Sequence, residues 1–201
     1  RPPTEGQTVG TMQPSRTSAE LCTPTLLLDC DFRKSEIRRK YGLSTSGHLL
    51  GGVHYLAVKA ELDEVIYETN LPNGYILPVA KNVPNPTILL ESERFGQMME
   101  QCCEKFGVIL VDTPPLGSVA DALNIATHCD GTVLVVRSGE TPRKLVGNSV
   151  QLLQRTEVPL LGVVLNRAEV NSKSSMYYNR YYKSGYYYKE HSHEKSGNAQ
   201  K

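Results

Sequence analysis

Residues 106–116 read FGVILVDTPPL, and this stretch determines how the rest of the chain is interpreted. Residues 108–111 are a short, continuous apolar run, which predicts a strand buried on both faces, as in the middle of a parallel sheet. Asp112 follows at the carboxyl end of this strand, where open α/β sheets bind their ligands. Pro114 and Pro115 then end the strand and stiffen the segment that leaves it.

A carboxylate at the end of such a strand suits a hydrated Mg²⁺ ion, because this ion binds one or two carboxylates together with phosphate oxygens. Asp112 is therefore a candidate metal ligand. An ordinary aspartate that caps the strand would give the same sequence, and this stretch alone favours neither interpretation.

The 201-residue chain is long enough for one domain with a substantial core. Its formal net charge of +1 gives no global electrostatic reason to expect a nucleic acid or membrane partner. No apolar run approaches the ~20 residues of a membrane-spanning helix, and no signal peptide is visible. The five cysteines form no CxxC pair, so we expect reduced thiols in a cytoplasmic protein. The chain begins at Arg1 without a methionine, as a fragment would.

Apolar, strand-like runs alternate with helix-compatible stretches along the chain. The expected strands are residues 26–28, 74–80, 108–111, 131–137 and 160–165. The expected helices are residues 32–41, 62–67, 88–105, 119–126 and 142–155, with Thr87 and Thr141 as caps and a glycine-marked loop at 42–52. This alternation predicts an α/β fold, a doubly wound and mostly parallel sheet with helices on both faces.

The two ends of the chain differ from this pattern. Residues 1–25 are polar and rich in proline and glycine, and a helix over 8–21 would contain Pro14 at a cost of roughly 3 kcal/mol. Residues 171–201 have almost no aliphatic side chains, so we expect one domain over 1–170 and a flexible tail over 171–201. The tail contains a cluster of tyrosines, namely Tyr177, Tyr178, Tyr181, Tyr182, Tyr186, Tyr187 and Tyr188.

Residues 26–31, LLLDCD, repeat the arrangement seen at Asp112, because an apolar strand again ends in carboxylates. The next residues, 32–41, are strongly basic. A solvated helix face is the simpler interpretation of this basic run, and a substrate or subunit interface is the alternative.

Together, LLLDCD at 26–31, VILVDTPP at 108–115 and the tyrosine cluster resemble the bacterial protein-tyrosine kinases of capsule and exopolysaccharide synthesis. These kinases are P-loop ATPases related to cell-division and plasmid-partition ATPases, and the resemblance covers roughly residues 20–190. It implies that LLLDCD is the second Walker-type motif and that VILVDTPP is Walker B. By this likeness Asp29 and Asp31 act at the metal and the attacking hydroxyl, Asp112 binds Mg²⁺, and Asn166 and Arg167 contact the adenine.

The chain departs from the family in the phosphate loop. Members of the family carry Gly-Lys-Ser/Thr about 22 residues before the first Asp of the LLLDCD-type motif, and this register falls on Glu5, Gly6, Gln7 and Thr8. The glycine and the metal-binding hydroxyl of Thr8 are present, but Gln7 replaces the lysine. Removing one preorganised stabilising donor typically costs ~2.7–4 kcal/mol of barrier lowering, so we expect Gln7 to slow the reaction at least ~10²-fold.

The resemblance implies transfer of the ATP γ-phosphoryl group to tyrosine, including the seven tail tyrosines as acceptors. The Mg²⁺ ligands would be Thr8, Asp29 and Asp112. Implied partners are a membrane-bound polysaccharide co-polymerase that activates the enzyme, further copies in a ring, and a cognate phosphatase. The implied location is the cytoplasm, at the inner face of the membrane through that partner.

Three other interpretations remain open. The chain could be a catalytically silent module with a kinase fold that serves as a regulator or a phosphorylation substrate, as Gln7 and Pro14 favour. It could be an altered copy of an active kinase, which the sequence does not distinguish from a silent module. A partition-type ATPase would share both Asp motifs, but such proteins tend to end in a basic or amphipathic helix, not in tyrosines.

Overall fold

A computed structural model of the chain describes residues 23–40, 49–116 and 120–168. The chain divides between Asn166 and Arg167 into two units, and the account below concerns the first. Three predictions lie outside the described residues: the helix over 8–21, the phosphate loop over 5–8 and the tyrosine-rich tail over 171–201.

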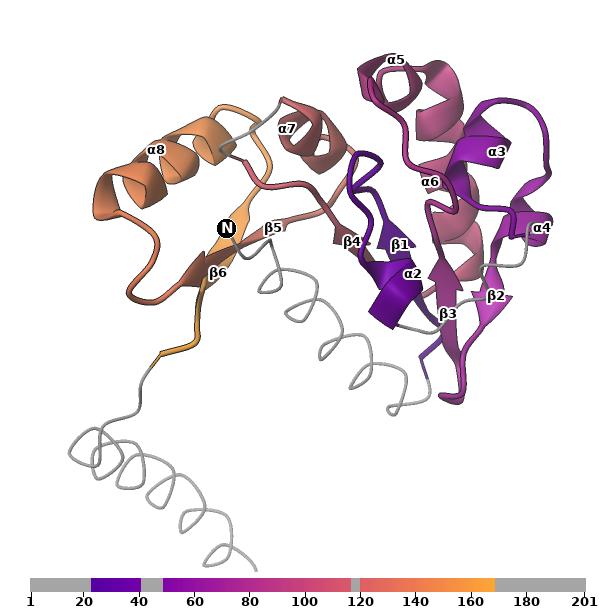
Figure 1. Cartoon of the computed structure of the whole chain (residues 1–201), viewed down its shortest axis with the longest axis horizontal. Coiled ribbons are helices and arrows are strands. Elements are labelled where there is room, and N and C mark those ends of the chain that lie inside the picture. Colours follow the sequence, from indigo (N-terminus) through magenta and orange to yellow (C-terminus); the bar gives the residue numbers. More distant parts are fainter. Residues whose placement is uncertain (1–22, 41–48, 117–119, 169–201) are drawn as a thin grey trace, which may run out of the picture. The chain divides into compact units, whose positions relative to one another are not determined.

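The larger sheet has four strands in the order β2-β3-β1-β4 (Figure 1). They are β1 (Thr25–Asp29), β2 (Tyr67–Glu68), β3 (Gly74–Leu77) and β4 (Val108–Asp112). β1 lies between β3 and β4 and is parallel to both, whereas the short β2 is antiparallel to β3. A second, parallel pair consists of β5 (Thr132–Arg137) and β6 (Leu160–Asn166). The α/β class and the mostly parallel pairing are thereby confirmed.

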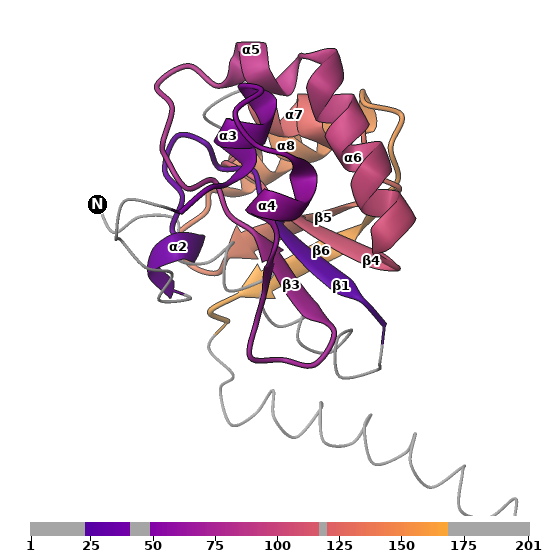
Figure 2. The same cartoon turned by 90° about the vertical axis from the view of Figure 1, so that its right-hand side faces the viewer.

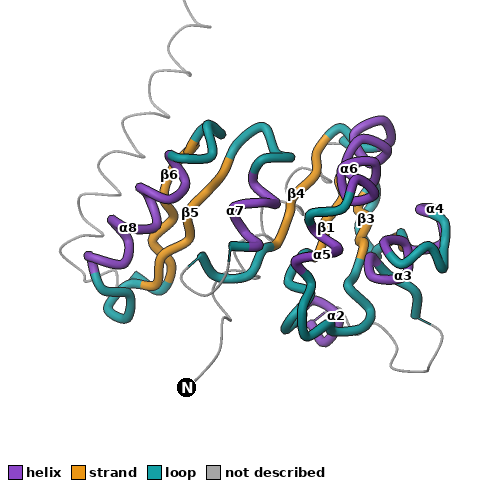
Figure 3. The backbone as a smooth tube through the Cα atoms, turned by 90° about the horizontal axis from the view of Figure 1, so that it is seen from above, coloured by secondary structure: helices purple, strands orange, loops and turns teal. Residues whose placement is uncertain are grey.

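Helices connect and cover these strands. They are α2 (Ile37–Lys40), α3 (Gly52–Leu56), α4 (Leu62–Val65), α5 (Thr87–Leu90), α6 (Glu93–Lys105), α7 (Asp121–Ala126) and α8 (Arg143–Gln154). Seen from above, α8 runs beside β5 and β6 (Figure 3), and it contacts both strands. In the portion that the structure describes, no helix is long and apolar enough to span a membrane.

The side chains of β1 alternate between the two faces of the larger sheet, as the period of a strand requires. Leu26 and Leu28 belong to the main core, where they join Tyr55 of α3 together with Phe95 and Met98 of α6. These helices lie on one side of the sheet in Figure 2. The strand is therefore fixed in register by the burial of its side chains on this face.

The opposite face of β1 has its own small cluster, in which Leu27 packs with Ile76 of β3 and Ile37 of α2. All three side chains are at most 2% exposed. Because both faces are covered, the apolar run before Asp29 forms a central, doubly buried strand, as its sequence indicates.

A third cluster fills the space between the β5–β6 pair and α8. It contains Leu134 and Val136 of β5 with Leu153 of α8. The short helix α7 packs against two clusters at once, since Leu123 contacts this third cluster and Ile125 is part of the main core.

Burial of β4 differs from the sequence prediction. Its side chains at 108–111 are half-buried, and among the described residues the strand pairs only with β1, at the edge of the four-stranded sheet. The β5–β6 pair likewise leaves Val133, Leu161 and Val163 more than half exposed. A fully apolar run identifies a strand, but it does not determine how many neighbours the strand has.

The helix expected over 88–105 is two helices, α5 and α6, separated at Glu91 and Ser92. Ser92 is the cap of α6, because its Oγ accepts a hydrogen bond from the amide of Phe95 at 3.3 Å. The prediction that Thr87 caps a helix over 88–105 is therefore wrong. Thr87 lies inside α5, and its hydroxyl donates to Asp121 at 2.9 Å.

Two further elements differ from the prediction. The basic stretch over 32–41 is helical only from Ile37, since the turn at Asp31 to Lys34 precedes α2. Part of the predicted glycine loop is helical, because α3 begins at Gly52. Gly51, which precedes it, touches the chain at Pro78: a Cβ atom there would lie 2.2 Å from the Pro78 carbonyl oxygen, so only glycine fits.

Thiol labelling tests this packing. Burial raises the pKa of Cys102 to about 12 and that of Cys129 to about 11, and it raises the pKa of Cys30 well above its ordinary value. Cys103 is exposed on the neighbouring position of α6. Because thiolates are the reactive form, iodoacetamide at pH 8 should modify Cys103 well before these three thiols. Peptide mass spectrometry over time measures the order, and labelling of Cys30 first would contradict the fold.

Candidate functional site

Two carboxylates meet at the carboxyl edge of the larger sheet. Asp29 ends β1, Asp112 ends β4, and the two residues are directly paired in the parallel register. The chain leaves β1 at Cys30, whose amide donates to the Asp112 carbonyl oxygen at 2.8 Å and continues the ladder beyond Asp29. The two strand-end motifs identified in the sequence are thus brought side by side.

Asp29 is enclosed by the protein, with 0% of its surface exposed, and Asp112 is 4% exposed. The Asp29 carboxylate accepts hydrogen bonds from the Ser35 hydroxyl and, at 3.2 Å, from the Asp31 amide. Burial raises the pKa of Asp29 to about 7, although the Ser35 hydrogen bond opposes the rise, and the negative charge of Asp112 raises it further. The negative charge of either carboxylate therefore disfavours ionisation of the other.

Asp31 lies on the loop that leaves β1 and is half-buried. Its amide supports Asp29, and its own Oδ1 accepts from the amide of Lys34 at 3.0 Å. This pair of side chain to backbone contacts bends residues 29–34 into a compact turn. Asp31 is therefore held at the same edge of the sheet as Asp29 and Asp112, and it is the most accessible of the three carboxylates.

These carboxylates fit Mg²⁺. The described residues contain no group of three or more His, Cys, Asp or Glu side chains arranged to hold a metal ion. Mg²⁺ does not need such a group, because it takes one or two carboxylates and completes its octahedron with water and phosphate oxygens. A divalent cation would also neutralise the repulsion between Asp29 and Asp112.

The other predicted site residues are placed only in part. Asn166 ends β6, and its carbonyl oxygen accepts from the amide of Ser138 at 2.8 Å. Arg167 follows with a φ of 54°, in the left-handed region. The predicted phosphate-loop residues Glu5, Gly6, Gln7 and Thr8, and all seven tail tyrosines, lie outside the described residues.

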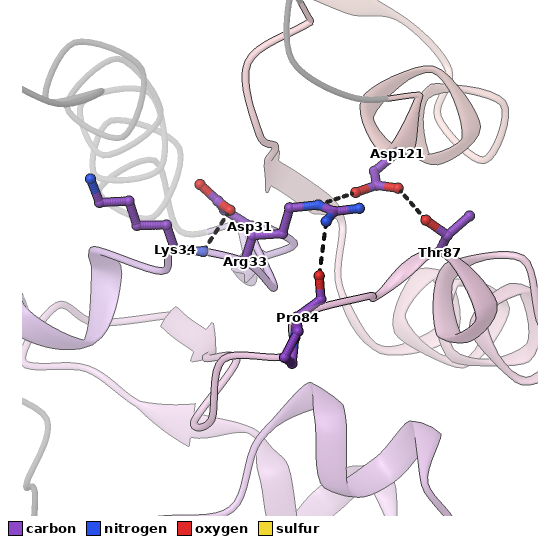
Figure 4. Close-up of polar contacts among 6 residues, drawn as sticks. All are labelled: Asp31, Arg33, Lys34, Pro84, Thr87 and Asp121. Atoms are coloured by element: carbon purple, nitrogen blue, oxygen red, sulfur yellow. Dashed lines mark hydrogen bonds and ion pairs between the residues drawn. The ribbon is translucent and has the colours of Figure 1, made fainter.

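The structure reveals an ion pair that the sequence analysis missed (Figure 4). Arg33, two residues after Asp31, donates from Nε to the Asp121 carboxylate at 2.9 Å and from Nη1 to the Pro84 carbonyl oxygen at 2.9 Å. Arg33 therefore does not belong to a solvated helix face. Asp121 follows the Walker B-like stretch at 108–115, and nothing in the sequence around it indicates its distant partner.

The arrangement can bind a cation and can accept a proton. Carboxylates at a sheet edge are ligands for a hard metal ion, and a carboxylate whose pKa lies near neutrality is suited to general base chemistry. Asp29, with a pKa of about 7, satisfies both conditions, while Asp31 is more accessible to an incoming group.

Comparisons of sequence and of structure both identify tyrosine-protein kinases as similar proteins. No family model matches the chain. The sequence is 35% identical over 173 residues to tyrosine-protein kinase CpsD of Streptococcus agalactiae, a match that covers 86% of this chain and 74% of that protein. The kinase domain of VpsO is similar in structure, with a TM-score of 0.77 at 29% identity, covering 83% of this chain and 81% of that one.

A more distant likeness concerns the fold alone. The septum site-determining protein MinD of Pyrococcus horikoshii, solved in complex with Mg-ADP, is 22% identical with a TM-score of 0.65. The match covers 83% of this chain and 67% of that one. The likeness shows that the two proteins share the α/β fold.

The raised pKa of Asp29 predicts a specific pH dependence of stability. The folded protein holds the Asp29 proton up to about pH 7, whereas the unfolded chain releases it near pH 3.8. Folded protein thus binds more protons in this window, and the group makes the free energy of unfolding fall as the pH rises. At about 1.4 kcal/mol per pKa unit, the loss is on the order of 4 kcal/mol.

An Asp29→Asn variant removes this titration. We expect it to match the wild type near pH 4 and to be more stable by several kcal/mol at pH 8 without metal, as measured by urea unfolding at both pH values. Asp63→Asn, at an exposed carboxylate that pairs with Lys105, is the control for removing a carboxylate elsewhere in the chain. A stability difference between Asp29→Asn and wild type that does not change with pH would contradict the assignment.

Proposed function

Because the chain belongs to the bacterial tyrosine-protein kinase family, we propose that it is a phosphotransferase domain that transfers the γ-phosphoryl group of ATP to tyrosine hydroxyls. The observation that carries the proposal is the direct pairing of Asp29 with Asp112 at the carboxyl edge of the sheet. Two buried carboxylates side by side at this edge of the sheet suit a metal–nucleotide complex.

In the proposed site, Asp112 and Asp29 hold Mg²⁺ together with the hydroxyl of Thr8. Amides around Gly6, beside Glu5 and Gln7, bind the phosphates, and Asn166 and Arg167 contact the adenine. When bound, Mg²⁺ offsets negative charge on the phosphates. Each of these assignments rests on the position of the residue in the family motifs.

Asp31 or Asp29 accepts the proton of the attacking phenol. The phenol oxygen forms a bond to the γ-phosphorus, the bond to the β–γ bridging oxygen breaks, and ADP leaves. A tyrosine hydroxyl has a pKa of ~10, so a carboxylate within hydrogen-bond reach increases the fraction that can react at neutral pH. The accessibility of Asp31 and its contact with Asp29 through the backbone amide support this pair as orienting and accepting groups.

The proposed acceptors are the seven tail tyrosines, Tyr177, Tyr178, Tyr181, Tyr182, Tyr186, Tyr187 and Tyr188. A tail of some thirty residues is long enough to reach the site of a neighbouring copy, which supports phosphorylation between subunits of a ring. Each phosphate adds about −1.5 to −2 charges, so a heavily modified tail would weaken such a ring. The proposed setting is capsular or exopolysaccharide synthesis at the inner face of the membrane, with a co-polymerase as activator and a cognate phosphatase.

Gln7 supports a second candidate function. A loop without its lysine lacks a positive charge at the terminal phosphates, so this chain would be a silent kinase-fold module and a phosphorylation substrate. A Gln7→Lys chain whose seven tail tyrosines are changed to phenylalanine separates the two functions. Mixed with the wild-type chain, it would place phosphate on the wild-type tail if that tail is a substrate between copies.

The Gln7→Lys substitution tests the kinase proposal directly. We expect it to tighten Mg·ADP binding in calorimetry and to raise tail phosphotyrosine by ~10²–10³-fold, because it restores a charge at the transferring group. Gln7→Met, of similar size and uncharged, is the matched control and should do neither. Absence of Mg·ADP binding and of phosphotyrosine in the Gln7→Lys chain would overturn the proposed function.

A further inference from the structure

Arg33 joins three separate segments of the chain (Figure 4). It lies on the loop after β1, and its guanidinium donates to Asp121 in the first turn of α7 and to the Pro84 carbonyl oxygen in the connection before α5. Both donor–acceptor distances are 2.9 Å. The neighbouring Lys34 is exposed, and Figure 4 shows its side chain directed away from this group. Of these two basic residues, only Arg33 acts as a connector.

Asp121 requires this pairing. Its carboxylate is 2% exposed and accepts one hydrogen bond from Arg33 and another, at 2.9 Å, from the hydroxyl of Thr87. Thr87 is neutral, so Arg33 supplies the positive charge of this contact. Because a buried carboxylate without a countercharge is strongly unfavourable, the pair holds the loop of Arg33 against α7.

The same loop carries Asp31 and begins directly after Asp29, the last residue of β1. The Asp31 amide donates to Asp29, and the Lys34 amide donates to Asp31, so Arg33 lies within the turn that these two contacts define. Between Asp31 and Arg33, Phe32 is buried and its carbonyl oxygen accepts from the amide of Val83 at 2.7 Å. The turn is thus attached at Phe32 and Arg33, directly after Asp31.

We propose that Arg33 is a positioning residue: its ion pair with Asp121 fixes the turn that presents Asp29 and Asp31 to the metal and the substrate. The pair thereby links the second Walker-type motif to the helix that follows Walker B. The metal and the substrate in this inference come from the proposed function. The role of Arg33 in holding the turn rests only on the contacts described above.

The turn is tested without ligand, by amide hydrogen exchange and ¹⁵N relaxation of the full chain. In Arg33→Met and in Asp121→Asn, the Asp31 and Lys34 amides should exchange about tenfold faster or more than in the wild type, through local opening. The double variant should exchange no faster than either single variant, since the two residues act as a unit. Arg33→Lys keeps the charge but lacks the planar fork, so its rates should lie between those of wild type and Arg33→Met.

Arg94→Met is the matched control. Arg94 is also half-buried, donates from Nε to a backbone oxygen, that of Tyr55, at 2.7 Å, and packs over the Tyr55 ring, away from the turn. This variant should leave the Asp31 and Lys34 amides unchanged. Equal acceleration in Arg94→Met, or no acceleration in Arg33→Met, would overturn the proposal, because Arg33 would then contribute only to general stability.

Calorimetric titration of the Gln7→Lys chain with Mg·ADP tests whether the turn contributes to nucleotide binding. Adding Arg33→Met should weaken binding 10–100-fold, the range typical of residues that orient metal ligands. Faster exchange with unchanged affinity would refute a role toward the ligand. A Gln7→Lys chain that binds no Mg·ADP would overturn the proposed function, and the exchange rates would still decide whether Arg33 holds the turn.

Discussion

The repulsion between two buried carboxylates is the constraint on which the site depends. The parallel register of β1 and β4 places Asp29 beside Asp112, and burial deprives both of the water that would screen them. Ser35 and the Asp31 amide donate hydrogen bonds to Asp29, and its pKa still rises to about 7. A fold that needed these residues only for stability would gain from replacing one carboxylate by a neutral group. The pair is consistent with a site built around an external cation.

The local patterns of the sequence predict the α/β fold, and the family resemblance implies that Asp29 and Asp112 act at the same metal ion. Apolar runs identify β1 and β4, and the carboxyl ends of parallel strands share one edge, but only the structure shows that the two strands are neighbours with Asp29 beside Asp112. The contacts that complete the site are not local. Arg33 binds Asp121, 88 positions further along the chain, and Thr87 binds the same residue, 34 positions further along. No periodicity of the sequence indicates either pair.

The elements that the sequence mispredicted share a physical cause, which is competition between local hydrogen bonds. Ser92 caps α6 from inside a stretch that has helical periodicity throughout, so one expected helix became two. The Asp31 carboxylate accepts a hydrogen bond from the Lys34 amide, and α2 therefore begins only at Ile37. The half-burial of β4 has a different origin, because a residue pattern describes a strand and not the number of strands beside it.

The short helix α7 has a consequence for how the molecule unfolds. Its Ile125 belongs to the core of the four-stranded sheet, and its Leu123 packs on the cluster of the β5–β6 pair, so this six-residue helix contacts two apolar clusters. Cooperative unfolding of the two sheets therefore depends in part on the packing of the short helix α7. If that link is weakened, the calorimetric enthalpy of unfolding should exceed the van't Hoff enthalpy, because the two sheets would melt as separate units.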